Sequence, residues 1–151
     1  MTKKHIAIEV MPRALWVVEI AAILLTEKMV GWAAISANHP TLIFFGSILA
    51  LVGLASLFWT FVFLAKPMFT KELMTKGPYA LARHPMYVAI YLTLIGLGLV
   101  FGSTAWFIVL LVFVPVWYLD CRLEEGQMTD LWDKDYPAYK QQVGMFFPHS
   151  F

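Results

Sequence analysis

Long apolar runs alternate with short polar segments along the chain and predict membrane-spanning helices. The clearest run, residues 41–65, contains no charged residue, and a helix needs about 20 mainly apolar residues to cross a bilayer. Residues 86–119 are also uncharged, but one helix of that length would reach about 50 Å, well beyond a hydrocarbon core of about 30 Å. Residues 102–104, Gly-Ser-Thr, offer a break, so this run predicts two helices that form a tight hairpin.

The first apolar run, residues 14–35, is long enough to span but contains Glu19, Glu27 and Lys28. An ionisable group inside a membrane is a functional candidate by default. Glu19 lies within about two helical turns of Arg13, so reaching the interface explains this carboxylate equally well. The pattern therefore predicts an all-α, polytopic membrane protein with about four transmembrane helices and a polar C-terminal tail.

Composition supports membrane integration. Of the 151 residues, 60% are hydrophobic and 14% are charged, whereas soluble domains are about 45–50% apolar and about 25% charged. The net charge of +1, without a basic patch, gives no indication of nucleic-acid binding. The single cysteine, Cys121, excludes an intrachain disulfide framework. We expect one membrane-embedded domain over residues 1–151, with spans one and two in residues 1–65 and the remaining spans in residues 66–151.

Lysine and arginine are distributed unevenly between the two ends of the predicted spans. With four spans and the N-terminus inside, one of the 11 basic residues, Lys28, falls on the outer side. The others fall on the inner side: Lys3, Lys4, Arg13, Lys66, Lys71, Lys76, Arg83, Arg122, Lys134 and Lys140. Because basic residues in short loops stay on the cytoplasmic side, the pattern predicts that both termini are cytoplasmic.

Two polar segments flank the predicted hairpin. The first is KGPYALARHPMY, residues 76–87, and the second begins with DCRLEE at residue 120. Since a short hairpin makes the third and fourth spans neighbours, the two segments should meet at one membrane face. The residues expected within reach of one another are Arg83, His84, Tyr87, Arg122, Glu124 and Glu125. Cations, carboxylates and aromatic rings together suit a zwitterionic ligand that carries a nucleoside.

Other familiar sites are not indicated. The four histidines, His5, His39, His84 and His149, are scattered without ligand spacing, so no metal site is predicted. No serine or cysteine lies in a nucleophile-elbow context, and the sequence has no glycine-rich phosphate loop.

The polar segments resemble those of a known family. GPYALARHPMY, a hydrophobic hairpin, EE, DYPAYKQQV and a late proline follow one another over roughly residues 66–148. This order resembles the superfamily of isoprenylcysteine carboxyl methyltransferases and phospholipid N-methyltransferases. The RHPxY motif alone is a weak signal. Together, the motif before the hairpin and the EE and DYPAYKQQV motifs after it are a strong signal at this spacing. The chain differs at Ala89, where the family usually has glycine two residues after the box tyrosine.

The resemblance implies a small integral-membrane enzyme that binds S-adenosylmethionine at the cytoplasmic face and needs no metal or nucleic acid. By the match of motifs, the cofactor-binding residues would be Lys76, Gly77, Pro78, Tyr79, Arg83, His84, Tyr87, Glu124 and Glu125. Arg122, facing the acceptor, and Glu125 are the expected catalytic residues. The partners would be the lipid bilayer and a lipophilic acceptor that arrives laterally from it.

The residues leave the type of acceptor open. A carboxylate acceptor is already anionic and needs only orientation by a cation such as Arg122. An amine acceptor must first lose a proton to a base such as Glu125 or His84. Carboxyl O-methylation of an isoprenylcysteine-like substrate is the favoured prediction, and N-methylation of a lipid amine or S-methylation of a thiol are alternatives on the same fold.

Two alternatives depart from methyl transfer. Membrane sterol-type reductases have a similar C-terminal box and use NADPH, whose 2′-phosphate would require further arginines, but this chain has three. The other alternative is a non-enzymatic membrane component in which the family motifs have lost their function. Ala89, in place of the usual glycine, is the one residue that points to it.

Overall fold

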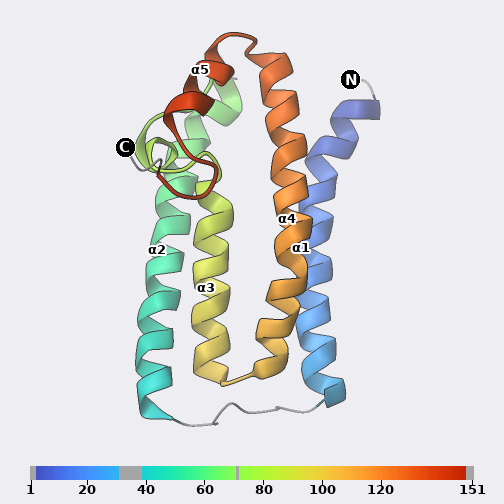
Figure 1. Cartoon of the computed structure of the whole chain (residues 1–151), viewed down its shortest axis with the longest axis vertical. Coiled ribbons are helices and arrows are strands. Elements are labelled where there is room, and N and C mark those ends of the chain that lie inside the picture. The colour runs from blue at the N-terminus through green and yellow to red at the C-terminus, as the bar shows by residue number, and fades with distance from the viewer. Residues whose placement is uncertain (1–2, 31–38, 71, 149–151) are drawn as a thin grey trace.

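The chain folds into a bundle of long helices (Figure 1). The computed structural model describes residues 3–30, 39–70 and 72–148, and side chains within residues 14–28, 39–64 and 72–148. The helices are α1 (Lys3–Val30), α2 (Pro40–Thr70), α3 (Pro85–Phe101), α4 (Thr104–Leu131) and α5 (Asp135–Gln142), with a 3₁₀ turn, η1 (Gly77–Ala80), before α3. The described residues contain no β-strand, so the all-α prediction is confirmed for them.

The predicted break between the third and fourth spans lies at Gly102 and Ser103. Gly102 ends α3 in the left-handed conformation, with a φ of 63°. Its backbone N–H donates hydrogen bonds to the carbonyls of Gly98 and Leu99. A side chain is strained in this conformation, which explains the glycine. Ser103 then caps α4, because its hydroxyl accepts a hydrogen bond from the N–H of Trp106 at 3.2 Å. The turn is therefore as short as the sequence indicates.

The two helices of this hairpin nevertheless diverge from their turn. α3 lies along α2, whereas α4 lies along α1 (Figure 1). Ser103 donates a hydrogen bond to Glu27 of α1, and the indole Nε1 of Trp117 on α4 donates to Glu19 of α1 at 2.8 Å. These buried bonds explain the pairing of α4 with α1. The expected hairpin thus opens away from its turn, toward the polar segments.

Glycines allow α2 and α3 to approach closely. A Cβ added to Gly96 of α3 would lie 2.4 Å from the backbone nitrogen of Ala50, and one added to Gly53 of α2 would lie 2.5 Å from that of Thr93. Small residues at helix interfaces permit such contact between backbones in a membrane. α2 therefore provides a closely packed support for α3.

We predict that Gly96→Ala lowers the free energy of unfolding by about 1–3 kcal/mol, because the added methyl group must push two backbones apart. Gly126→Ala is the matched control. Gly126 is exposed on α4 with nothing within 4 Å of an added Cβ, so alanine should leave stability unchanged or raise it by up to about 1 kcal/mol. Unfolding both variants in one detergent measures the difference, and equal stabilities would argue against the close α2–α3 contact.

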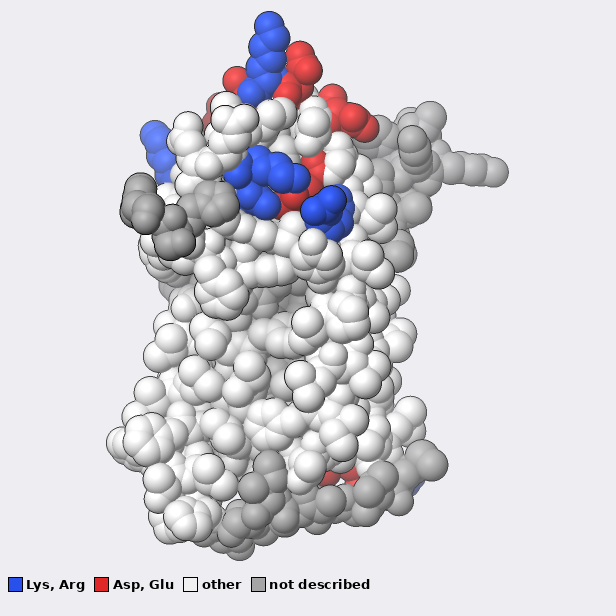
Figure 2. All heavy atoms as spheres, in the orientation of Figure 1, with Lys and Arg blue, Asp and Glu red and all other residues white. Residues whose placement is uncertain are grey.

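The surface of the bundle is apolar over much of its length. Among the described residues, Pro40–Leu64 and Thr104–Leu131 are long and apolar enough to cross a membrane, whereas α3 has 17 residues and would reach about 26 Å. Figure 2 shows most of the charged side chains of this face gathered at one end, then a wide band without lysine, arginine, aspartate or glutamate, and a small charged area at the opposite end. These features support membrane integration. The end of the predicted first span, residues 31–35, lies outside the described residues.

The segments with candidate functional residues lie at one end of the bundle. α1 and α3 begin at this end, α2 and α4 finish there, and α5 lies beside them (Figure 1). We call it the polar end. Lys28, the basic residue predicted on the opposite side, lies in the last turn of α1, at the other end.

Candidate functional site

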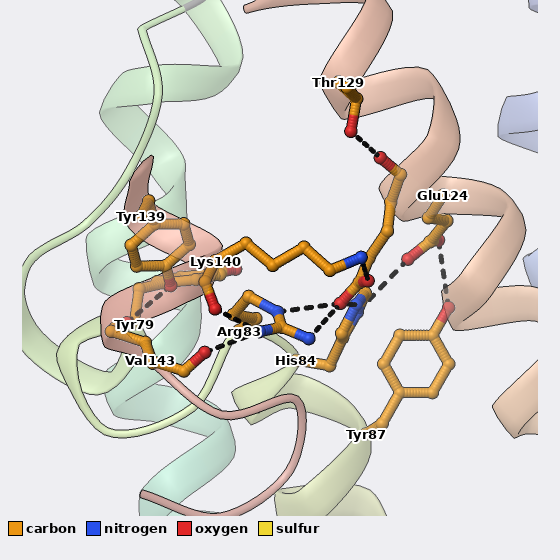
Figure 3. Close-up of polar contacts among 10 residues, drawn as sticks. Tyr79, Arg83, His84, Tyr87, Glu124, Thr129, Tyr139, Lys140 and Val143 are labelled. Atoms are coloured by element: carbon orange, nitrogen blue, oxygen red, sulfur yellow. Dashed lines mark hydrogen bonds and ion pairs between the residues drawn. The ribbon is translucent and has the colours of Figure 1, made fainter. Parts of the chain in front are cut away.

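The two polar segments predicted from the sequence meet at the polar end (Figure 3). The first of them is held in place by the C-terminal segment. The backbone N–H groups of Arg83 and His84 donate to the carbonyls of Gly144 and Met145 at 2.9 and 3.0 Å. The paired glutamates come from α4, which extends beyond the start of α3. The contact expected between the start of α3 and these glutamates is therefore present.

Arg83 and the partly exposed Lys140 form a clamp around the buried carboxylate of Glu125. Arg83 Nε and Nη2 each lie 2.7 Å from Glu125 Oε1, and Nη1 donates to the carbonyls of Lys140 and Val143 at 2.9 and 2.6 Å. Lys140 Nζ lies 2.6 Å from Glu125 Oε2, and Glu125 is 1% exposed. All three guanidinium nitrogens of Arg83 are engaged. The clamp therefore joins the segment before α3 to α4 and α5.

His84 is buried between the two glutamates. Its Nδ1 lies 3.4 Å from Glu124 Oε2, and its Nε2 lies 3.6 Å from Glu125 Oε1. Burial disfavours the charged ring, but the thiol of Cys121 and the carboxylates of Glu124 and Glu125 around it outweigh burial and raise the pKa of His84 to about 11. The ring is therefore protonated at neutral pH.

The hydroxyl of Tyr87 lies between two carboxylates. It is 3.0 Å from Asp120 Oδ2 and 3.0 Å from Glu124 Oε1. A phenol has one proton and donates it to one oxygen at a time. Neither carboxylate forms an ion pair with a described lysine or arginine. Among the described residues, the cation that contacts Glu124 is therefore the ring of His84.

Aromatic rings continue the site toward the middle of the bundle. Trp16 of α1 stacks on Trp117 of α4 at 3.8 Å between ring centroids, and Tyr87 meets Trp117 edge-on at 5.3 Å. Glu19, fully buried, accepts hydrogen bonds from Trp117 at 2.8 Å and Tyr91 at 3.3 Å. Glu19 thus fixes these rings inside the bundle and does not reach toward the interface.

A cavity of about 470 Å³ opens beside these groups. Of the predicted cofactor residues, Tyr79, Arg83, His84, Tyr87 and Glu124 line it. Most of the other lining side chains are apolar or aromatic: Trp16, Leu64, Met86, Ile90, Met128, Leu131 and Trp132. Burial and the charge of Glu124 raise the pKa of Tyr79 to about 12. Its phenol therefore stays neutral at this wall.

Five predicted residues do not line this cavity: Glu125, which the clamp encloses, and Lys76, Gly77, Pro78 and Arg122. Lys76 and Arg122 are exposed, and neither makes a hydrogen bond or ion pair with a described residue. Gly77 has a φ of 62° and packs under Phe63, whose ring would lie 2.5 Å from an added Cβ. Pro78 lines a second cavity, of about 260 Å³. The backbone conformation therefore explains why residue 77 is a glycine. Lys76 and Arg122 lie outside the cavity.

Ala89, the departure from the family pattern, borders the second cavity and not the larger one. It is 1% exposed, and its carbonyl accepts a hydrogen bond from the hydroxyl of Thr93 at 2.9 Å. An added Cβ on Gly53 of α2 would lie 2.9 Å from the same carbonyl. Ala89 therefore faces α2, and its methyl group does not narrow the larger cavity.

Several site residues were missed at the level of sequence. Trp117, Cys121 and Glu124 recur at helical spacing on α4, which places them on one helix face. That spacing was the available signal for Trp117 and Cys121. Lys140 had no such signal, because its contact with Glu125 depends on how α5 folds back on α4.

The chain matches the family model described as "Phospholipid methyltransferase" over residues 37–135, more than half of its length. It therefore belongs to the phospholipid methyltransferase family, within the superfamily that also contains the isoprenylcysteine carboxyl methyltransferases. The proteins of this superfamily are membrane-embedded methyltransferases, in agreement with the apolar helices of the bundle.

The chain is also similar to the nickel-cobalt-cadmium resistance protein NccN of Alcaligenes xylosoxydans xylosoxydans. The two are 29% identical over 77 residues, which cover 51% of this chain and 36% of that protein. The match thus spans about a third of the length of this curated relative. No solved structure matches the chain.

Proposed function

We propose that the protein is an S-adenosylmethionine-dependent methyltransferase that acts on a lipophilic acceptor in the membrane, with the cofactor in the cavity of about 470 Å³. The observation that carries the proposal is the position of this cavity. It is lined both by His84, Tyr87 and Glu124 of the family motifs and by apolar side chains of the helices. Its volume lies in the range of about 300–1,000 Å³ that is usual for small-molecule sites.

The residues at the cavity fit this cofactor. When bound, S-adenosylmethionine supplies a methyl group on a positively charged sulfur. Glu124 lines the cavity with the ring of His84 as its charged partner, and Asp120 shares the hydroxyl of Tyr87 with Glu124 and has no lysine or arginine partner among the described residues, so these two carboxylates can attract a cationic ligand. Tyr79, Tyr87 and Trp132 line the cavity, and aromatic rings offer stacking surfaces for a purine. The Arg83–Glu125–Lys140 clamp would act indirectly, by holding His84 and the paired glutamates in place.

The acceptor that we favour is an amine. Arg122, the cation predicted to orient a carboxylate, is exposed and outside the cavity, and Arg83 is engaged in the clamp. Glu124 lines the cavity and suits both roles that an amine requires, attracting the ammonium form and then accepting its proton. Glu125, the predicted base, is enclosed by the clamp. The remaining task is to align acceptor and methyl group, which is worth about 7–11 kcal/mol in well-oriented reactions.

Carboxyl methylation of an isoprenylcysteine-like acceptor is the second candidate. It needs a cation that faces the cavity, and the protonated ring of His84 supplies one. The name of NccN refers to resistance to three metals, and a match to about a third of that protein carries no argument about the acceptor of this chain.

We also propose that the polar end faces the cytoplasm and that α1 and α3 span the membrane together with α2 and α4. The charged side chains gathered at one end (Figure 2) support this orientation. The cofactor would then arrive from the cytoplasm and the acceptor from the bilayer, through the apolar wall of the cavity.

Thermal unfolding of the purified protein tests the cofactor. S-adenosylmethionine and its demethylated product should each raise the midpoint of unfolding, because a ligand at 100 times its Kd stabilises a folded protein by about 2.7 kcal/mol. NADPH should leave the midpoint unchanged. Stabilisation by NADPH alone would favour the reductase alternative, and no stabilisation by any of these ligands would favour a non-enzymatic component. Either result would contradict the proposal.

A further inference from the structure

Three side chains that commonly bind metal ions meet beside the cavity. His84, Cys121 and Glu124 each place a ligand atom within 4.8 Å of the other two. Cys121 is completely buried and His84 is 4% exposed, whereas the side chain of Glu124 is 24% exposed and lines the cavity. The group is therefore buried on one side and reachable from the cavity on the other.

The spacing of His84 and Glu124 suits two ligands of one ion. Their Nδ1 and Oε2 atoms are 3.4 Å apart, longer than the about 2.7–2.9 Å of a charge-assisted hydrogen bond. Nitrogen and oxygen ligands lie about 2.0–2.2 Å from tetrahedral zinc, which places them about 3.3–3.6 Å from each other. An ion therefore fits between His84 and Glu124 with little movement, and the Cys121 sulfur, within 4.8 Å of both ligand atoms, needs a shift of at most about 1.2 Å to complete the triangle.

The other nitrogen of His84 faces a fixed carboxylate. His84 Nε2 makes no hydrogen bond to a described residue, and Glu125 Oε1 lies 3.6 Å away. Metal-bound histidines almost always direct their second nitrogen to a carboxylate, carbonyl or water, which orients the ring. Glu125 is itself immobilised by Arg83 and Lys140. The clamp thus provides the outer support that a metal-bound histidine needs.

The charge of the site accommodates a divalent cation. Arg83 and Lys140 contact Glu125, Asp120 and Glu124 share the single hydroxyl of Tyr87, and the remaining cation of the cluster is the ring of His84 beside Glu124. Thiolate, imidazole and carboxylate ligands together suit zinc and its neighbours, whereas magnesium and calcium prefer oxygen ligands alone. We propose that His84, Cys121 and Glu124 form a binding site for a divalent cation of the zinc class.

The ion would tie α4 to the start of α3. Cys121 and Glu124 lie on α4 and His84 immediately precedes α3, so the bound ion bridges the open end of the diverging hairpin. Binding would release the proton of the Cys121 thiol and a proton of the His84 ring, because metal ligands must be deprotonated. The bound ion thereby replaces the positive charge that the protonated ring of His84 supplies when no ion is bound.

Titration with Co²⁺, a spectroscopic substitute for zinc, tests the site in tag-free protein without S-adenosylmethionine. We expect a thiolate-to-cobalt charge-transfer band that saturates at one ion per chain. The sequence has a single cysteine, so the band reports on Cys121 directly. Zn²⁺ should displace the cobalt, and Mg²⁺ should not.

Substitutions identify the ligands. Cys121→Ser should abolish the band, and His84→Gln and Glu124→Gln should each weaken cobalt binding at least about tenfold. His39→Gln, at an exposed position at the far end of the bundle, is the matched control and should leave the titration unchanged. Absence of the band in the wild-type protein would overturn the proposal, and so would a titration unaffected by His84→Gln and Glu124→Gln. The spectrum requires no methyl transfer, so its outcome is independent of the proposed function.

Discussion

Arg83→Ala will lower the free energy of unfolding by about 3–5 kcal/mol, because it removes one of the three ion-pair partners of the buried carboxylate of Glu125, the one that also donates a hydrogen bond to it. Arg122→Ala is the matched control on the other polar segment. Arg122 is exposed and pairs with no described residue, so its loss should change stability by less than about 0.5 kcal/mol. Equilibrium unfolding of the two variants in the same detergent measures the difference.

A double variant separates the clamp from general damage to the site. Arg83→Met with Glu125→Leu removes both buried charges, and such apolar replacements of buried pairs are often tolerated. The double variant should therefore be more stable than Arg83→Ala alone. If Arg83→Ala and Arg122→Ala unfold alike, the clamp is not the tie between the motif and α4 that its geometry indicates.

Glu124→Gln will reduce methyl transfer about 10- to 100-fold while leaving the fold intact. The amide oxygen of glutamine still accepts the hydrogen bond from Tyr87, but the negative charge at the cavity is lost. A hydrogen bond to a charged group is worth about 1.5–3 kcal/mol, and each 1.36 kcal/mol is a factor of ten. Asp130→Asn, an exposed carboxylate on the same helix, should leave the rate unchanged.

The assay is run with a metal chelator, so that binding of an ion at Glu124 does not contribute to the rate. Equal rates for Glu124→Gln and Asp130→Asn would remove Glu124 from the reaction and with it the argument for an amine acceptor. A proportional loss of folded protein in Glu124→Gln alone would indicate a structural role instead.

The helices could be predicted from sequence because their signals are local. An uninterrupted apolar run predicts α2, and a run too long for one helix predicts the break between α3 and α4. Glycine ends helices and serine begins them, as Gly102 and Ser103 do here. The divergence of α3 from α4 could not be predicted in the same way. It depends on close backbone contact at Gly96 and on hydrogen bonds that Glu19 and Glu27 accept from residues far along the chain.

The sequence predicts which residues gather at the candidate site but not what each of them contacts there. The motifs brought His84, Tyr87 and Glu124 to one cavity. They did not reveal that Arg83 and Glu125 bind each other, since a basic and an acidic motif residue suggest ligand contacts equally well. From the sequence, Cys121 is a single cysteine without a disulfide partner. Its position beside His84 is apparent only in the folded chain.

The central claim is methyl transfer to a membrane acceptor at the cavity of Glu124, and a labelled methyl group tests it most directly. Purified protein is incubated with S-adenosylmethionine carrying a labelled methyl and with a membrane lipid extract. The lipid fraction is counted and then treated with alkali, and the labelled methanol that evaporates is collected. We predict label in the lipid that yields no volatile methanol, because alkali does not cleave an N-methyl group, and a loss of about 10- to 100-fold with Glu124→Gln. Label released as methanol would indicate a carboxyl methyl ester and the second acceptor. Lipid label no higher for the wild-type protein than for Glu124→Gln would contradict the account.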